Sequence, residues 1–146
     1  MSARYLIDNS VIQRLHRSAE VRAARDRLMR SGDLAVCLPT LLEACFSARS
    51  HEEHQAAAEG YLSGWMILAP APEILNIALR VQSELFRAGK GRSVGVSDLQ
   101  IAATALHHDA EDRPVVVVHY DADFDHIRSV EPALKASWVV PKGTVA

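Results

Sequence analysis

The amino-acid sequence predicts an α/β fold in which helices cover both faces of a parallel sheet. Short apolar runs alternate along the chain with longer segments of helical periodicity. Strands of this kind are typical of sheets that are buried on both faces. Regular alternation of strands and helices favours a parallel sheet, because each helix returns the chain to the start of the next strand.

Five apolar runs are the predicted strands. The first of them ends directly at Asp8, and the plainest is the run of four valines at residues 115–118. The strands are predicted at residues 5–7, 34–38, 65–68, 115–118 and 137–140.

The helices are predicted from amphipathic periodicity and from residues that begin or end helices. Ser10 can cap the first helix, and Pro39 suits the first turn of the third. Ser97 and Gln100 match a capping box that opens the sixth helix. The helices are predicted at residues 10–17, 19–30, 39–49, 52–63, 72–88, 98–110 and 124–128.

Length and composition indicate a single domain over residues 1–146. No apolar run approaches the ~20 residues needed to cross a bilayer. The first ten residues lack a secretory signal, so we expect a cytoplasmic protein. Cys37 and Cys45 do not form a CxxC pair, and we expect both to be reduced core residues. The net charge of −2 gives no indication of a nucleic-acid partner.

Two aspartates follow predicted strands close to the point where each strand ends. Asp8 comes directly after the first strand, and Asp121 closely follows the strand at residues 115–118. In open α/β sheets, binding sites form outside the carboxyl ends of the strands. If the two strands are neighbours, about 4.8 Å apart, their terminal carboxylates converge.

Two further acids lie among apolar residues of the sequence. Asp98 shares a helix face with isoleucine and alanine residues, so its carboxylate is expected to point inward, where an unpaired charge is costly. Glu43 is the one charged residue in the apolar run at residues 41–46. Each acid also has a structural explanation, since aspartates suit helix N-termini and turns, and a glutamate can extend to solvent.

A cluster of these carboxylates has a chemical consequence. Two carboxylates ~5 Å apart repel by ~3 kcal/mol at an effective dielectric of ~20, so a group of four would become partly protonated or recruit a cation. All-oxygen ligands favour Mg²⁺ or Mn²⁺. Such an ion can activate water and neutralise charge on a phosphodiester, so the acids predict metal-dependent phosphodiester chemistry.

Four stretches of the sequence resemble the PIN domain, and in particular the VapC toxins of bacterial type II toxin–antitoxin systems. They are YLIDNSVI at Asp8, LPTLLEACFSARS at Glu43, VSDLQIAATA at Asp98 and VVVVHYDADFDHI at Asp121, in the family's order. The resemblance implies a three-layer α/β/α sandwich with a mostly parallel central sheet. It also implies an endoribonuclease that uses Mg²⁺ or Mn²⁺ on tRNA or rRNA. The protein would be a homodimer, inhibited by a VapB antitoxin that reaches into the acidic pocket.

The resemblance further implies roles for individual residues. Asp8, Glu43 and Asp98 match the core acids, with Asp8 and Asp98 holding the metal and Glu43 orienting or deprotonating the attacking water. Asp121 matches the fourth acid, and Asp123 competes with it for that role. Asp121 is favoured because it lies closer to the strand end, and both are candidate metal ligands.

Other residues are expected around this centre. Ser10 occupies a position where the family often has a small hydroxyl residue near the metal, and Asp125 is not expected to contact the ion. RNA must approach an acidic pocket, so basic residues should surround it. The candidates are Arg14, Arg17, Arg49, Lys90 and Arg92.

Two other functions use the same residues differently. Asp121 and Asp123 resemble the DxD nucleophile pair of Mg²⁺-dependent phosphatases, but that pair is expected after the first strand, where this chain has Asp8-Asn9-Ser10. A catalytically weak PIN-like RNA-binding module would be expected to lack one or more acids, and all four are present. The short length favours the toxin over other PIN nucleases.

Overall fold

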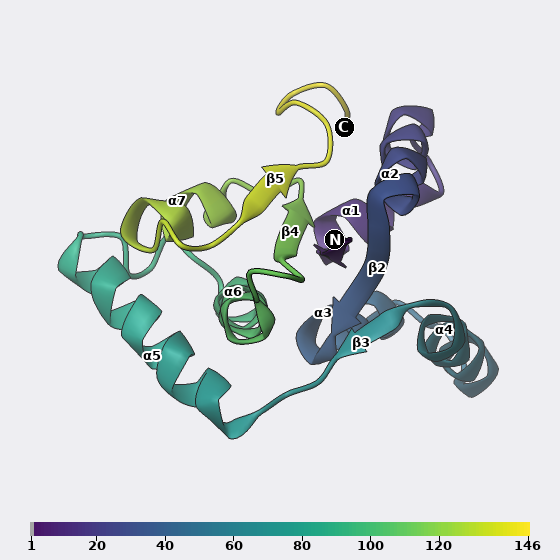
Figure 1. Cartoon of the computed structure of the whole chain (residues 1–146). Coiled ribbons are helices and arrows are strands. Elements are labelled where there is room, and N and C mark those ends of the chain that lie inside the picture. Colours follow the sequence, from purple (N-terminus) through teal and green to yellow (C-terminus); the bar gives the residue numbers. More distant parts are fainter. Residues whose placement is uncertain (1) are drawn as a thin grey trace.

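The structure, a computed structural model, describes residues 2–146 and confirms the predicted α/β fold (Figure 1). Met1, the first residue of the predicted domain, lies outside the described residues. Over residues 2–146 the chain forms five strands and seven helices. In chain order they are β1 (Ala3–Ile7), α1 (Asn9–Leu15), α2 (Ala19–Ser31), β2 (Gly32–Cys37), α3 (Leu38–Phe46), α4 (His51–Gly64), β3 (Met66–Leu68), α5 (Pro72–Arg87), α6 (Val96–His108), β4 (Val115–His119), α7 (Asp123–Val130) and β5 (Ala136–Trp138).

The strands form one sheet in the order β3-β2-β1-β4-β5, and every neighbouring pair is parallel. The chain moves outward from β1 to β2 and β3, then returns to the other side of β1 to form β4 and β5. β1 and β4 are therefore neighbours, with Ile7 opposite Val118. This reversal of strand order is the point at which open α/β sheets bind ligands, outside the carboxyl ends of the strands.

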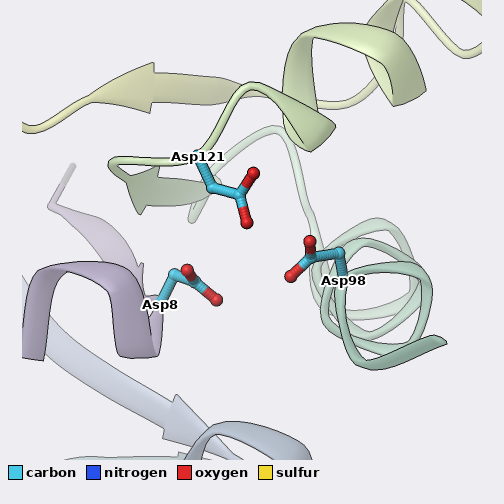
Figure 2. Close-up of side chains that lie close together, drawn as sticks. All are labelled: Asp8, Asp98 and Asp121. Atoms are coloured by element: carbon cyan, nitrogen blue, oxygen red, sulfur yellow. The ribbon is translucent and has the colours of Figure 1, made fainter. Parts of the chain in front are cut away.

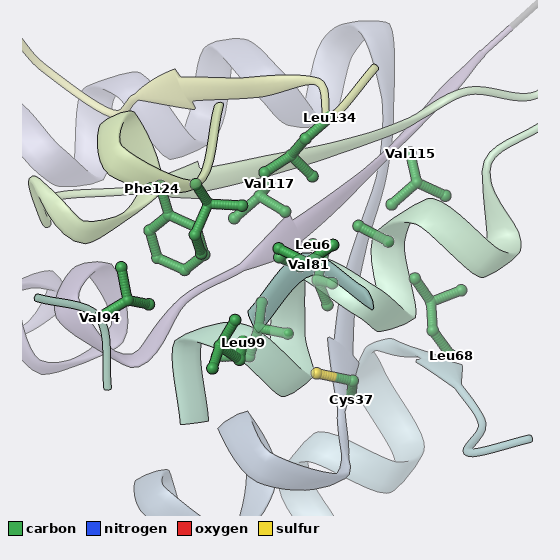
Figure 3. Close-up of a cluster of buried hydrophobic side chains, with 14 of the residues drawn as sticks. Leu6, Cys37, Leu68, Val81, Val94, Leu99, Val115, Val117, Phe124 and Leu134 are labelled. Atoms are coloured by element: carbon green, nitrogen blue, oxygen red, sulfur yellow. The ribbon is translucent and has the colours of Figure 1, made fainter. Parts of the chain in front are cut away.

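Two apolar clusters fill the two faces of the sheet. On one face Leu6 and Val117 pack with residues of α5, α6 and α7 (Figure 3). On the opposite face Ile7 and Val118 pack with residues of α1 and α2. Adjacent residues of a strand point to opposite faces, so the continuous apolar runs supply both clusters at once. The result is the three-layer α/β/α sandwich that the resemblance implied (Figure 1).

The predicted helices and strands are all present, but two predicted helix caps are wrong. Helix α6 begins at Val96 with Gly95 as its N-cap, and no side chain caps it. Ser97 is therefore already inside the helix and cannot form the predicted capping box. Asp8 rather than Ser10 caps α1, because the Asp8 carboxylate accepts the backbone N–H of Ser10.

Several large apolar side chains stay exposed on α3 and α5. The exposed fraction is 58% for Leu42 and 90% for Phe46 on α3, and 66% for Leu75 and 56% for Leu79 on α5. Exposed apolar residues that gather on one helix are typical of surfaces that another chain covers. The two cysteines are buried free thiols, as predicted. No helix within residues 2–146 is long and apolar enough to span a bilayer.

Candidate active site

Asp8 lies where β1 ends and α1 begins, and it is only 4% exposed. Its Oδ2 accepts two hydrogen bonds from Ser10, one from the backbone N–H at 3.0 Å and one from the hydroxyl at 2.5 Å. Burial raises the pKa of Asp8, and the bonds from Ser10 oppose part of that rise. The Ser10 hydroxyl also accepts the N–H of Tyr120 at 2.8 Å. Ser10 thereby joins the end of β1 to the end of β4.

Asp98 lies in the first turn of α6, on a helix face whose other members, Ile101, Ala102 and Ala105, are buried. The buried face directs the Asp98 carboxyl inward, as its helical position predicted. Burial raises the pKa of Asp98 to about 9, and hydrogen bonding with the Asp123 carboxyl adds to the rise. A carboxyl with this pKa is protonated at neutral pH, and a cation beside it would favour the charged form.

Asp121 lies in the loop between β4 and α7, and two hydrogen bonds fix its position. Its Oδ1 accepts the N–H of Asp123 at 2.9 Å. Its own N–H donates to Nδ1 of His119 at 3.2 Å. The loop after β4 is therefore held from both sides, and the Asp121 carboxylate points toward Asp8 and Asp98 (Figure 2).

The carboxylates of Asp8, Asp98 and Asp121 converge (Figure 2), and one oxygen from each lies within 4.8 Å of the other two. No ion pair among residues 2–146 includes any of the three. With bonds of about 2.1 Å, oxygen ligands of an octahedral Mg²⁺ lie about 3.0 Å apart when adjacent and about 4.2 Å apart when opposite. Side-chain rotations that shorten the distances between the three oxygens would bring them onto one ion, so the residues fit Mg²⁺ or Mn²⁺.

The two aspartates that follow Asp121 lie outside the group of three, although Asp123 also lies against the Asp98 carboxyl. Oδ2 of Asp123 accepts the N–H of Gly95 at 3.1 Å and so ties α7 to the start of α6. Asp125 accepts the indole N–H of Trp138 at 3.3 Å. Asp121, and neither of these two, belongs to the group of three converging carboxylates.

Glu43 lies on the exposed side of α3 and outside the group of three. It is close enough to Asp8 for its charge to raise the pKa of that carboxyl. Glu43 extends to solvent, and Leu42 and Phe46 in the same apolar run are exposed as well. In the isolated chain, Glu43 therefore has access to solvent beside the acidic cluster.

The predicted RNA-contacting residues differ in how many contacts they make within the protein. Arg14 is engaged within the fold, because its guanidinium lies 4.6 Å from the centre of the Tyr120 ring and donates to the Ser10 carbonyl at 2.5 Å. It is therefore less available to RNA than the other four candidates. Those four lie at the surface, where Lys90 donates to Ser129, Arg49 pairs with Glu53, and Arg17 and Arg92 are exposed.

His119 is a residue of this centre that the sequence analysis did not identify. It is the last residue of β4, is 1% exposed, and has its ring centre 4.8 Å from that of Phe124 and 5.0 Å from that of Trp138. Burial lowers the pKa of His119 to about 4, so its imidazole is neutral at pH 7. The available signal was a histidine after four valines, two residues before Asp121.

Comparison with known proteins identifies the family. The PIN domain family model matches residues 5–130. The chain is a PIN-domain protein. This PIN-domain chain is 38% identical over 145 residues to Ribonuclease VapC21 of Mycobacterium tuberculosis (strain ATCC 25618 / H37Rv), with 99% of each chain covered. It has the same identity and coverage with Ribonuclease VapC51 of the same strain. It therefore belongs to the VapC family of PIN-domain proteins.

Solved structures confirm the PIN-domain fold. DNA-bound VapBC from Salmonella typhimurium superposes with a TM-score of 0.72 at 22% identity, covering 96% of this chain and 100% of that one. VapBC2 from Rickettsia felis, bound to a DNA fragment from its promoter, superposes with a TM-score of 0.71 at 18% identity, covering 92% and 97%. At these identities the likeness concerns the fold alone.

Proposed function

We propose that this VapC-family protein is a divalent-metal-dependent endoribonuclease and the toxin of a type II toxin–antitoxin pair. The observation that carries the proposal is the convergence of Asp8, Asp98 and Asp121 at the carboxyl ends of β1 and β4. The absence of a balancing ion pair at these acids, among the residues that the structure describes, favours a cation as their partner. Two relatives that are named ribonucleases support RNA as the substrate.

The chain's own residues divide the chemistry among them. Asp8, Asp98 and Asp121 hold the ion, and Ser10 keeps the Asp8 carboxylate oriented. When bound, Mg²⁺ or Mn²⁺ supplies a Lewis acid that makes water a stronger nucleophile and neutralises phosphate charge. Glu43 has solvent access beside the cluster, so it orients the attacking water and accepts its proton. In-line attack of this water forms the new bond to phosphorus and breaks the bond to the 3′-oxygen, which takes a proton from solvent, so the products are a 5′-phosphate and a 3′-hydroxyl.

The substrate in this proposal is tRNA or rRNA, and the exposed cations contact its phosphates. Arg17, Arg49, Lys90 and Arg92 lie at the surface and are the candidates for this contact. Each phosphate contact releases counterions, so binding of a catalytically inactive variant to RNA should weaken as salt rises. Binding that is independent of salt would exclude this role for the four residues.

The direct test is cleavage of purified total tRNA and rRNA by the wild type, Asp8→Asn and Asp112→Asn. Asp112 is a matched control, because it is an exposed acid just before β4, at the opposite end of the sheet. The wild type and Asp112→Asn should cleave with Mg²⁺ or Mn²⁺ and stop when EDTA is added. Asp8→Asn should be folded and inactive, and full activity in that variant would overturn the proposal.

Exposed apolar residues on two helices support two protein partners. Leu42 and Phe46 flank Glu43 on α3, so an antitoxin segment that covers them can reach the acidic cluster. Leu75 and Leu79 on α5 suit the interface of a homodimer. Phe46→Ser should weaken inhibition by the VapB-like product of a neighbouring gene and leave the dimer intact, whereas Leu79→Ser should do the reverse. Light scattering and inhibition assays measure the two effects.

A further inference from the structure

We propose that His119 is the positioning residue of the acidic centre, and that it acts by accepting the backbone N–H of Asp121 at its Nδ1. The inference rests on the proposed metal-dependent function, because it concerns how one of the three converging carboxylates is held in place. Among residues 2–146, His119 is the one aromatic side chain that hydrogen-bonds directly to a backbone atom of that aspartate.

The ring of His119 has a fixed orientation. It is 1% exposed, and its centre lies 4.8 Å from that of Phe124 and 5.0 Å from that of Trp138, with interplanar angles of 33° and 58°. Packing of this kind prevents the ring from turning without disturbing α7 and β5. The Nδ1 atom therefore remains directed at the N–H of Asp121, 3.2 Å away.

This hydrogen bond completes a set of three that defines the loop after β4. The N–H of Tyr120 goes to the hydroxyl of Ser10, and the N–H of Asp121 goes to His119. The N–H of Asp123 then goes to Oδ1 of Asp121 itself. Ser10 connects this loop to Asp8, so the backbone at Asp121 is set relative to both its own strand and the neighbouring one. Groups that orient metal ligands in this way affect metal affinity although they do not touch the ion.

An alternative role for His119 is packing alone, and two substitutions separate the two roles. His119→Phe keeps a ring between Phe124 and Trp138 but has no acceptor for the N–H. His119→Asn loses the ring, but its Oδ1 occupies a position equivalent to Nδ1 and accepts the same N–H. If His119 has a positioning role, the wild type should bind metal most tightly, His119→Asn less tightly and His119→Phe most weakly. A packing role gives the reverse order for the two variants.

The experiment is titration of the purified full-length chain and its variants with Mn²⁺ alone, followed by calorimetry or by the electron paramagnetic resonance signal of free Mn²⁺. His119→Phe is expected to bind Mn²⁺ about 10- to 100-fold more weakly than the wild type. His119→Asn is expected to remain close to the wild type. Wild-type affinity in His119→Phe, or equal losses in both variants, would overturn the inference.

A measurement on the wild type keeps the test independent of how the variants fold. In a long-range proton–nitrogen NMR spectrum at neutral pH, Nδ1 of His119 should be the unprotonated nitrogen and Nε2 the protonated one. A proton on Nδ1 would overturn the inference. The proposed function fails separately: if the wild type does not bind Mn²⁺, both proposals fall. If Asp8→Asn abolishes binding while His119→Phe does not affect it, only the role of His119 falls.

Discussion

The aspartates at the two ends of the central sheet differ in whether a basic side chain balances their charge. At the amino end, Asp109 accepts the N–H of Val115 at 2.9 Å and the ammonium of Lys135 at 2.8 Å, while Asp33 pairs with Arg113 at 3.3 Å. At the carboxyl end, within the part of the chain that the structure describes, three converging aspartates form no ion pair. An aspartate that is paired with a lysine or arginine of the protein stabilises the fold. A group of aspartates without such a partner is a candidate site for a bound cation.

The largest expected effect concerns activity at the carboxyl end. Asp98→Asn should reduce RNA cleavage by at least about 100-fold, because even groups that only support metal ligands contribute 10- to 100-fold. Cleavage rates at saturating Mn²⁺ measure the effect. Asp33→Asn, at the amino end, should cleave at the wild-type rate. Similar losses in both variants would remove the distinction between the two ends.

Metal should stabilise the fold through the carboxyl end only. At Mg²⁺ or Mn²⁺ concentrations 100 times the dissociation constant, the free energy of unfolding should rise by about 2.7 kcal/mol. Thermal unfolding with and without the ion measures the gain, which should persist in Asp109→Asn. If Asp98→Asn is stabilised as strongly as the wild type, then the ion binds elsewhere.

Removing an acid at the amino end should cost stability and leave activity unchanged. Asp109→Asn should lower the free energy of unfolding by about 1 to 2 kcal/mol, mainly through the weakened bond from the Val115 N–H. The ion pair with Lys135 contributes less, because the lysine side chain is 45% exposed. Urea denaturation provides the measurement, and a loss of RNA cleavage with unchanged stability would contradict the assignment.

The smallest expected effect is a gain in stability without metal. Two carboxylates within 4.8 Å of each other repel by at least about 3 kcal/mol at an effective dielectric of about 20, and protonation of Asp98 already relieves much of this repulsion. Asp98→Asn keeps this position neutral without the cost of protonating a carboxyl at pH 7, and its amide can donate to the neighbouring carboxylates. We expect about 1 kcal/mol of added stability in EDTA, measured by urea denaturation. If Asp98→Asn is less stable than the wild type in EDTA, repulsion among the three carboxyl groups does not destabilise the metal-free protein.

Much of the fold could be predicted from the sequence because its determinants are local. The runs at Tyr5–Ile7 and Val115–Val118 are continuous and apolar, and this pattern requires burial on both faces whatever the rest of the chain does. The position of Asp8 and Asp121 at the ends of these strands then follows from the topology of parallel sheets. Asp98 was also predictable, since the neighbours on its helix face are apolar.

The rest could not be predicted because it depends on contacts between distant segments. Asp121 belongs to the converging group, whereas Asp123 lies beside Asp98 and accepts the N–H of Gly95 from another part of the chain, and the sequence pattern does not show this contact. The exposure of Glu43 could not be settled from the sequence, since an exposed apolar helix face has the same residue pattern as a core helix. His119 acts through a backbone N–H, and no pattern of residue types reports where that N–H points.

The pairing of β1 with β4 has a consequence for protein synthesis. The hydrogen bond between Ser10 and Tyr120 that joins their ends connects residues 110 positions apart. At translation rates of about 5 to 20 residues per second, roughly 5 to 20 seconds separate the emergence of the two halves of the centre from the ribosome. During that interval the nascent chain contains Asp8 but not Asp121, so the group of three carboxylates cannot form. Under the proposed function, cleavage of RNA can begin only after β4 has been made, and an antitoxin has that interval in which to be present.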